Sequence, residues 1–318
     1  MSVSLCSNPP LIGQVACQAI CILGMRRGGA SVVAGMLNYL GVEMGLEFKS
    51  TASQNLAASW EHAQIADCSS DLLAALNYRF EDLHPLPAGW ENSGEAANCR
   101  RGLLKLLRAE FQDKPLWGFK DPRACRLLPL WNGIFDELGV VPGYILVARH
   151  PDEVAASLSA CGGFSYNQSL LLWLNHMLQA ERQTRARHRV LVTFDQILSD
   201  WRRQAWKIAC ALGLSYPRSL EKIGDEIDEL LDPSLRHHRV GPVATAGQAV
   251  CMRGADSRLA RWAFKVYHLL AAAAADKYSR VDPGELDVVA REFNASALKL
   301  AAANPAREKA ALAKCVPL

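Results

Sequence analysis

A short apolar stretch that runs directly into a glycine-rich turn constrains this chain more than any other feature. Residues 20–24 are typical of a buried strand, and residues 29–40 are predicted to form a helix. The turn between them, Gly24 to Ser31, contains Arg26 and Arg27. Backbone N–H groups of such a turn converge on an anion, and the positive end of the following helix favours negative charge. The sequence therefore predicts a phosphate-binding loop.

The spacing of this loop is close to the nucleoside triphosphatase pattern G-x-x-x-x-G-K-[ST] but differs at one place. Gly24, Gly29 and Ser31 fit the pattern. Ala30 stands where the lysine belongs. An ATP-dependent kinase needs that lysine, and it needs an acidic residue at a strand end for Mg²⁺, where this chain has Arg149. A kinase is therefore the least favoured alternative.

Strands and helices alternate along the rest of the chain. The sequence predicts strands at residues 116–119, 144–148 and 190–194, and helices over 55–77 and 167–187. This alternation favours βαβ units and a parallel sheet. The expected fold is α/β, a P-loop-like three-layer arrangement with a central, mostly parallel sheet flanked by helices.

Three parts are expected in the domain organisation: an N-terminal leader (1–18), one large domain (19–290) and a C-terminal helical tail (291–318). Within the domain, residues 257–278 are expected to form an Ala-rich amphipathic helix. The basic loop at 235–242 is a solvated surface, a segment that closes over a nucleotide, or part of a site for an anionic acceptor.

Charge balance and cysteine spacing argue against several classes of protein. Lys and Arg number 35 against 32 Asp and Glu, a net charge of +3, so neither a nucleic-acid partner nor a membrane surface is indicated. Ten cysteines show no C-x-x-C pair and no Cys/His spacing, so we predict neither a metal site nor a disulfide framework. No apolar run is long enough to span a bilayer. We expect a soluble, cytoplasmic protein, and the oligomeric state stays open.

Three segments together resemble the bacterial sulfotransferases of the carbohydrate and natural-product type, which use 3′-phosphoadenosine 5′-phosphosulfate (PAPS). Their loop commonly has the sequence G-M-H-R-S-G-T-S. This chain has Gly24-Met25-Arg26-Arg27-Gly28-Gly29-Ala30-Ser31, with Gly28 and Ala30 in place of a Ser and a Thr. The other two segments are residues 116–123 and 144–158, and the resemblance spans about residues 19–290.

The resemblance implies a nucleotide site with two phosphate-binding parts. In that family an Arg at a strand end and a Ser eight residues later hold the 3′-phosphate of PAPS, and Arg149 and Ser157 match in type and spacing. The 5′-phosphosulfate would be bound by Arg26, Arg27, Gly28, Gly29, Ala30 and Ser31. Independently of the family, an Arg leaving the carboxyl end of a strand points into the crevice where open α/β sheets bind ligands, and its planar fork suits phosphate.

Sulfuryl transfer needs a cation at the bridging oxygen and a base that accepts the acceptor's proton. Arg27 and Lys120 are the candidate cations. Glu61 is the favoured base because it resembles the Glu of the family's G-Y-[WF]-E element, and the adjacent His62 is the alternative. Many aryl and steroid sulfotransferases have a His where this chain has Pro122, which points away from small phenols as acceptors.

The expected activity is transfer of a sulfuryl group from PAPS to a hydroxyl of a glycan, glycolipid or other natural product, leaving adenosine 3′,5′-bisphosphate. The alternative is a catalytically silent protein of the same fold that binds PAPS or its product. Trp60 and Phe194 are either platforms for the adenine or members of the core. The sequence does not identify the acceptor.

Overall fold

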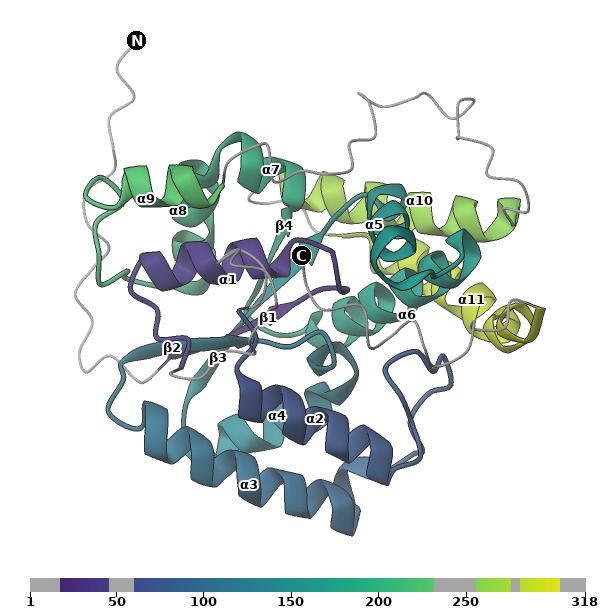
Figure 1. The fold of residues 1–318 in the computed structure, drawn as a ribbon, viewed down its shortest axis with the longest axis horizontal. Helices are drawn as coiled ribbons and strands as arrows, with labels where there is room; N and C mark the ends of the chain where they lie inside the picture. Colours follow the sequence, from purple (N-terminus) through teal and green to yellow (C-terminus); the bar gives the residue numbers. More distant parts are fainter. Residues whose placement is uncertain (1–17, 46–59, 232–255, 276–280, 304–318) are drawn as a thin grey trace.

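One parallel sheet forms the centre of the molecule in a computed structural model of the 318-residue chain, which describes residues 18–45, 60–231, 256–275 and 281–303. Within these ranges the sheet has four strands in the order β2-β1-β3-β4 (Figure 1). The strands are β1 (Gln18–Leu23), β2 (Leu116–Lys120), β3 (Val141–Ala148) and β4 (Arg189–Thr193). All three strand pairings are parallel. The α/β fold predicted from the sequence is confirmed.

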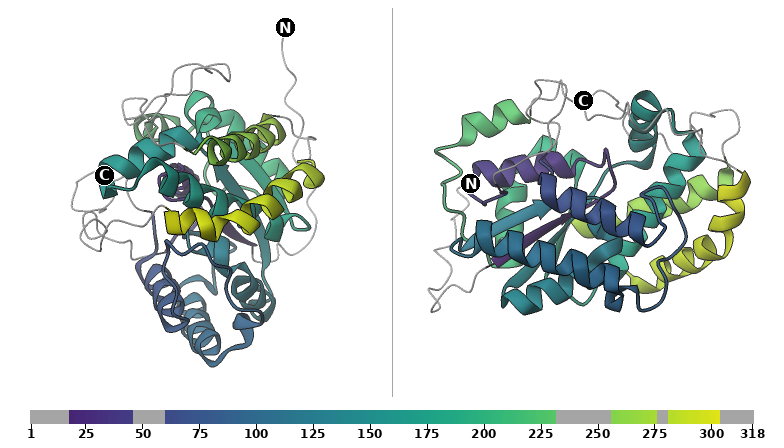
Figure 2. Two further views of the ribbon diagram at one scale, coloured as in Figure 1. Left: turned by 90° about the vertical axis from the view of Figure 1, so that its right-hand side faces the viewer. Right: turned by 60° about the horizontal axis from the view of Figure 1, so that its bottom comes forward.

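Helices cover both faces of the sheet, which gives the three layers (Figures 1 and 2). The lower layer of Figure 1 contains α2 (Ala63–Ala75), α3 (Gly94–Phe111) and α4 (Ala124–Leu138). The upper layer contains α1 (Ala30–Tyr39), α8 (Trp201–Leu212) and α9 (Gly224–Leu230). At the right of Figure 1 lie α5 (Pro151–Gly162), α6 (Tyr166–Thr184), α10 (Ser257–Ala275) and α11 (Pro283–Ala303). The short elements are η1 (Trp90–Asn92) and α7 (Phe194–Ser199).

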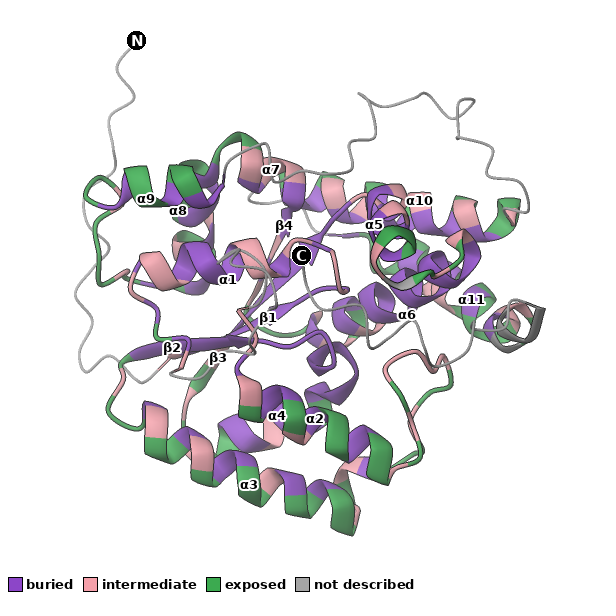
Figure 3. Cartoon of the chain, in the orientation of Figure 1, coloured by how far each residue is buried: buried purple, intermediate pink, exposed green. Residues whose placement is uncertain are grey.

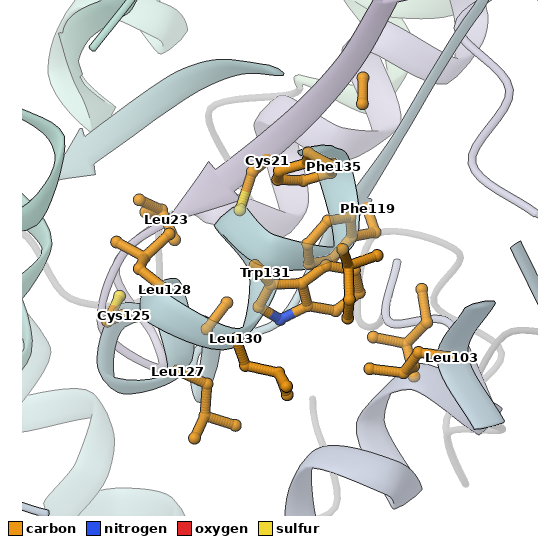
Figure 4. Packing of buried hydrophobic residues seen from close by; sticks show 14 of the residues in the cluster. Cys21, Leu23, Leu103, Phe119, Cys125, Leu127, Leu128, Leu130, Trp131 and Phe135 are labelled. Atoms are coloured by element: carbon orange, nitrogen blue, oxygen red, sulfur yellow. The ribbon is translucent and has the colours of Figure 1, made fainter. Parts of the chain in front are cut away.

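Alternation along β1 divides the core between the two faces of the sheet. Cys21 and Leu23 pack with α2, α3 and α4, whereas Ile20 and Ile22 pack with α1, α8 and α9. A strand buried on both faces has a nearly continuous apolar sequence, which explains why this segment of β1 is so recognisable. The lower cluster is rich in aromatic rings (Figure 4), and the stacked rings of Phe119 and Trp131 have centroids 4.0 Å apart.

A third apolar cluster joins α5, α6, α10 and α11, and it corrects the expected end of the domain. Leu286, Val289, Phe293 and Ala297 of α11 recur at spacings of three and four residues and are all buried in this cluster (Figure 3). The boundary predicted between residues 290 and 291 therefore falls inside a packed helix. The predicted leader up to residue 17, the basic loop 235–242 and residues 304–318 lie outside the described residues.

Capping side chains explain where the helices begin. The helix predicted over 167–187 is α6, whose start is fixed by a capping box between Ser165 and Gln168. A second capping box, between Thr193 and Gln196, starts α7 at Phe194, so the strand predicted through residue 194 ends one residue earlier.

The start of α2 also differs from the prediction. Within the helix expected over 55–77, residues 60–62 are not helical, and α2 begins after His62, whose side chain caps it.

Candidate functional site

The carboxyl ends of the four strands bring the candidate residues to one edge of the sheet. Lys120 ends β2, the loop after Leu23 follows β1, and Arg149 follows β3. Ile22 pairs with Lys120, and Leu23 pairs with Leu146. Because β1 lies between β2 and β3, the glycine-rich loop lies between Lys120 and Arg149 at this edge. Open α/β sheets bind their ligands at this position.

Tight geometry in the loop accounts for its glycines. Gly29 has a φ of 90°, and a Cβ at this residue would lie 2.4 Å from Cδ2 of Phe194. A Cβ on Gly28 would lie 2.6 Å from the carbonyl oxygen of Met25, which also accepts the N–H of Gly28 at 2.9 Å. The serine of the family pattern does not fit this turn at position 28. Arg27 has a φ of 64°, an uncommon backbone conformation that occurs often at ligand sites.

The N-terminus of α1 faces the same edge of the sheet. Gly29 is its N-cap and has no side chain that could accept from the first turn, and Ala30 and Ser31 are the first two helical residues. The first N–H groups of a helix have no intrahelical acceptor, and they carry the positive end of the helix dipole. The loop and the start of α1 therefore present backbone N–H donors to an anion at this edge of the sheet.

Three segments distant in the sequence meet beside this loop. Nε of Arg27 donates to Oγ of Ser157 at 2.7 Å, although the two residues are 130 positions apart. Nη1 of Arg149 donates to the carbonyl oxygen of Arg27 at 3.2 Å. Ser157 lies on α5 and is buried. The structure thus brings together Arg27, Arg149 and Ser157, the residues singled out for the two phosphate-binding parts.

Arg149 is held by two neighbouring side chains. Its Nε donates to Oε2 of Glu153 at 2.9 Å, one helical turn further on in α5. Its guanidinium carbon lies 4.4 Å from the ring centroid of Phe194. Arg149 and Glu153 are 9% and 1% exposed. The spacing of four residues was the sequence signal for Glu153. Phe194 packs under Arg149 and is buried, as a member of the core would be.

A second cluster forms where β2 ends. Nζ of Lys120 donates to Oε1 of Glu61 at 2.8 Å, and Nη2 of Arg123 lies 3.6 Å from Oε2 of the same carboxylate. The side chains of Lys120 and Glu61 are 5% and 13% exposed. Glu61 comes from the segment just before α2, 59 residues earlier in the chain. The pairing of the predicted cation with the predicted base therefore arises from the fold.

Two carboxyl groups of this cluster have pKa values displaced in opposite directions. Burial acts to raise the pKa of Glu61, but the charges of Lys120 and Arg123, with a smaller contribution from Arg26, lower it to about 2. Burial raises the pKa of Asp121, and the charge of Glu61 adds to this effect while Arg123 opposes it. Glu61 is therefore ionised at neutral pH, and in this ion pair it is a weaker base than a free carboxylate.

His62, the alternative base, has a different environment from Glu61. Its Nδ1 accepts from the backbone N–H of Ile65 at 3.5 Å, which caps α2. Its Nε2 lies 3.0 Å from Oε2 of Glu110 on α3, and the side chain is fully buried. His62 thus joins α2 to α3. Glu61 lies beside Lys120 at the end of β2, whereas His62 is held between α2 and α3, so its position favours Glu61 as the base. Both assignments stay predictions.

The remaining candidates lie at the rim of these clusters. Arg26 is half-buried, and its guanidinium carbon lies 5.2 Å from the ring centroid of Phe80. Phe80 also packs against His176, with ring centroids 4.6 Å apart. Trp60 packs against the core cluster that contains α1. Both proposed adenine platforms, Trp60 and Phe194, therefore pack against the core.

The low pKa of Glu61 predicts a specific dependence of stability on pH. A carboxyl whose pKa is about 2 in the folded state and 4.5 in the unfolded state stabilises the fold above pH 4.5. The stabilisation is lost as the pH falls from 4.5 towards 2. We expect Glu61→Gln to make the free energy of unfolding fall less steeply with decreasing pH, by up to about 1.4 kcal/mol per pH unit.

Urea unfolding at several pH values below 5 measures this slope. Glu137→Gln is the matched control, because Glu137 pairs with Arg100 and Arg108 but is 41% exposed, and an exposed ion pair contributes little. Equal slopes for wild type and Glu61→Gln would contradict the buried pairing with Lys120.

The described ranges contain neither a group of metal-ligating side chains nor a helix that could span a membrane. In residues 18–45, 60–231, 256–275 and 281–303, no group of three or more His, Cys, Asp or Glu side chains is arranged to hold a metal ion. In the same residues, no helix has both the length and the apolar character required to cross a membrane.

Comparison with known proteins found similarity among solved structures. No protein-family model and no curated protein matches the chain. Among solved structures, the chain is similar to the sulfotransferase domain of the olefin synthase from Synechococcus PCC 7002, with 17% sequence identity and a TM-score of 0.45. The similarity covers 80% of this chain and 94% of that domain.

Proposed function

We propose that the protein is a sulfotransferase that moves a sulfuryl group from PAPS to a hydroxyl of a glycan, a glycolipid or another natural product. The observation that carries the proposal is the assembly of Arg27, Ser157 and Arg149 beside the N-terminus of α1, at the carboxyl ends of the strands. Two adjacent anion-binding groups suit a nucleotide with phosphates at both its 3′ and 5′ positions.

In this proposal the nucleotide is held from two sides. The 5′-phosphosulfate binds to the loop residues 26–31 and to the first N–H groups of α1, whose dipole favours the charge. The 3′-phosphate binds to Arg149 and Ser157. Arg149 keeps Glu153 as a partner on its Nε and the carbonyl oxygen of Arg27 as an acceptor for its Nη1, and these contacts hold its guanidinium beside the loop. Glu153 and Phe194 act as positioning residues for that guanidinium.

Chemistry would take place between the loop and Lys120. The acceptor oxygen attacks sulfur, the bond from sulfur to the bridging oxygen breaks, and adenosine 3′,5′-bisphosphate leaves. Negative charge grows on the bridging oxygen, where Lys120 and Arg27 supply compensating charge. Glu61 accepts the proton of the acceptor hydroxyl. As the leaving phosphate draws Lys120 away from Glu61, the loss of that cation raises the pKa of Glu61 and makes it a better base.

Selective stabilisation by nucleotides tests the proposed binding site. Adenosine 3′,5′-bisphosphate without metal should raise the melting temperature of the full chain, because a ligand that binds the folded state stabilises it. Mg-ATP should raise it far less. The reverse order would favour a kinase, and no shift with either nucleotide would overturn the proposal.

Activity has to be measured separately from binding. Transfer of label from PAPS to a panel of glycan, glycolipid and hydroxylated natural-product acceptors distinguishes a sulfotransferase from a silent binding protein. Binding of adenosine 3′,5′-bisphosphate with no turnover on any acceptor class would favour the second candidate, a catalytically silent binding protein. The sequence feature that supports this candidate is the presence of Gly28 and Ala30 in place of a Ser and a Thr.

Arg149→Ala should weaken the affinity for adenosine 3′,5′-bisphosphate about 10- to 100-fold, since a hydrogen bond to a charged group contributes roughly 1.5–3 kcal/mol. The affinity for adenosine 5′-phosphate should change little, because that nucleotide lacks the 3′-phosphate. Isothermal titration calorimetry with both nucleotides measures the ratio.

The ratio of the two affinities corrects for any loss of stability. Arg149→Ala leaves Glu153 buried without its cation, which weakens the fold and affects both nucleotides equally. Arg202→Ala is the matched control, because Arg202 forms a comparable pair with Asp228 at an exposed position. Equal losses for both nucleotides would remove Arg149 from the 3′-phosphate site.

A further inference from the structure

Two cysteines that are 31 residues apart meet between α2 and α3. The Sγ atoms of Cys68 and Cys99 lie 2.8 Å apart. Each thiol also lies 3.6 Å from the carbonyl oxygen of the other cysteine, so the contacts are reciprocal. The length of a disulfide bond is about 2.05 Å, so a further approach of about 0.8 Å would bring the two sulfurs to bonding distance. The packing of the two helices, which Figure 1 shows side by side, already supplies the alignment.

The two thiols differ in access and in acidity. Cys68 is half-buried, whereas Cys99 is 8% exposed. The hydrogen bond from Cys99 lowers the pKa of Cys68. The same bond and burial raise the pKa of Cys99. Since the thiolate is the nucleophile in disulfide exchange, Cys68 is the thiol that an external reagent reaches first, and Cys99 lies next to it as the resolving thiol.

We propose that Cys68 and Cys99 are a redox modification site that forms a reversible disulfide with a low-molecular-weight disulfide such as glutathione disulfide as the oxidant. The Cys68 thiolate attacks one sulfur of glutathione disulfide and releases one glutathione thiolate. Cys99 loses its proton, attacks Sγ of the mixed disulfide and releases the second glutathione thiolate. The two cysteines lose two protons and two electrons in total, and one glutathione disulfide becomes two glutathione thiols.

A disulfide here would tie together two helices on the flank of the candidate site. At its N-terminal end α2 is already joined to α3 by His62 and Glu110, and Glu61 immediately precedes that end. The bond between residues 68 and 99 would add a covalent link further along the same pair of helices. The constraint acts mainly on the unfolded chain, where it closes a loop. The proposal does not depend on the proposed activity.

Oxidation of the full-length protein with glutathione disulfide, followed by intact mass and peptide mapping, tests the site. We expect the loss of about 2 Da, one cross-linked pair of peptides containing residues 68 and 99, and reversal by dithiothreitol. The melting temperature of the oxidised protein should exceed that of the reduced protein by roughly 4–8 °C.

Cysteine variants identify the two residues of the disulfide and define the results that would overturn the proposal. Cys68→Ser should abolish both the cross-link and the temperature shift, and Cys99→Ser should leave Cys68 as a stable mixed disulfide with glutathione. Cys210→Ser, at an exposed position on α8, should behave as wild type and is the control. A stable mixed disulfide at Cys68 of the wild type, or no modification of either residue, would overturn the proposal even where one variant fails to fold.

Discussion

Glu61→Gln is expected to lower turnover about 10²- to 10⁴-fold, the usual contribution of a positioned general base, while the affinity for adenosine 3′,5′-bisphosphate changes by no more than a few-fold. The amide keeps the shape of the side chain but cannot accept the proton. Lys120 can still hydrogen-bond to the amide oxygen, so the cation stays close to its present position. Turnover of labelled PAPS and calorimetry with the product nucleotide measure the two quantities separately.

A variant of His62, with Glu137→Gln as the control, tests whether Glu61 or His62 is the base. Glu137→Gln removes an exposed carboxylate that pairs with arginines and should leave turnover unchanged. His62→Gln should weaken the link to Glu110 and the cap of α2, which lowers stability more than it changes the pH profile of turnover. If Glu61→Gln has normal turnover and the turnover of His62→Gln no longer depends on pH, His62 is the base.

Local patterns allowed most of the sheet and its main helices to be predicted. β1, β2 and β3 are buried on both faces, so their apolar runs are distinct from the amphipathic helices around them. The errors arose where a single side chain decides a boundary. Thr193 starts a helix at Phe194, and His62 delays the start of α2. The packing of α11 was not predicted, because residues 291–318 were expected to form a C-terminal tail and the buried positions of this helix are separated by polar and alanine residues.

Contacts between distant segments set the limit for predicting the site. Arg149 and Ser157 were predicted from a resemblance to sulfotransferases in residue type and spacing, which a sequence shows because both residues lie on one strand-to-helix unit. Nothing in the spacing of Arg27 and Ser157, or of Glu61 and Lys120, indicates that their side chains hydrogen-bond to each other. The approach of Cys68 and Cys99 was missed for the same reason, since it depends on how α2 packs on α3. Such pairs follow from tertiary packing and are visible only in the folded chain.

The glycine at position 28 illustrates how the fold changes the meaning of a departure from a pattern. From the sequence, Gly28 and Ala30 are losses of hydroxyl groups that would otherwise contact a phosphate. In the structure, the turn has no room for a Cβ at residue 28, and Ala30 is buried at the start of α1. Arg27, Ser31 and the N–H groups of α1 remain as donors at that edge. The loop is therefore consistent with anion binding through its backbone.

Lys120→Met is expected to lower turnover about 10²- to 10³-fold, the effect of removing one group that stabilises developing charge in the transition state. Methionine has nearly the same length and flexibility, so it fills the same buried space without the charge. The substitution also leaves Glu61 with Arg123 as its nearest cation, at 3.6 Å. We therefore expect a loss of stability, and that loss has to be separated from the loss of catalysis.

A double-mutant cycle with Glu61→Gln achieves this separation. The buried carboxylate is what makes Lys120→Met unstable, so the combined variant should regain stability in urea unfolding. Catalysis should not recover, because both the cation and the base are then absent. Lys114→Met is the control, since Lys114 pairs with Glu43 at a distance of 4.0 Å and is 44% exposed. Recovery of turnover together with stability in the double variant would remove both Lys120 and Glu61 from the reaction.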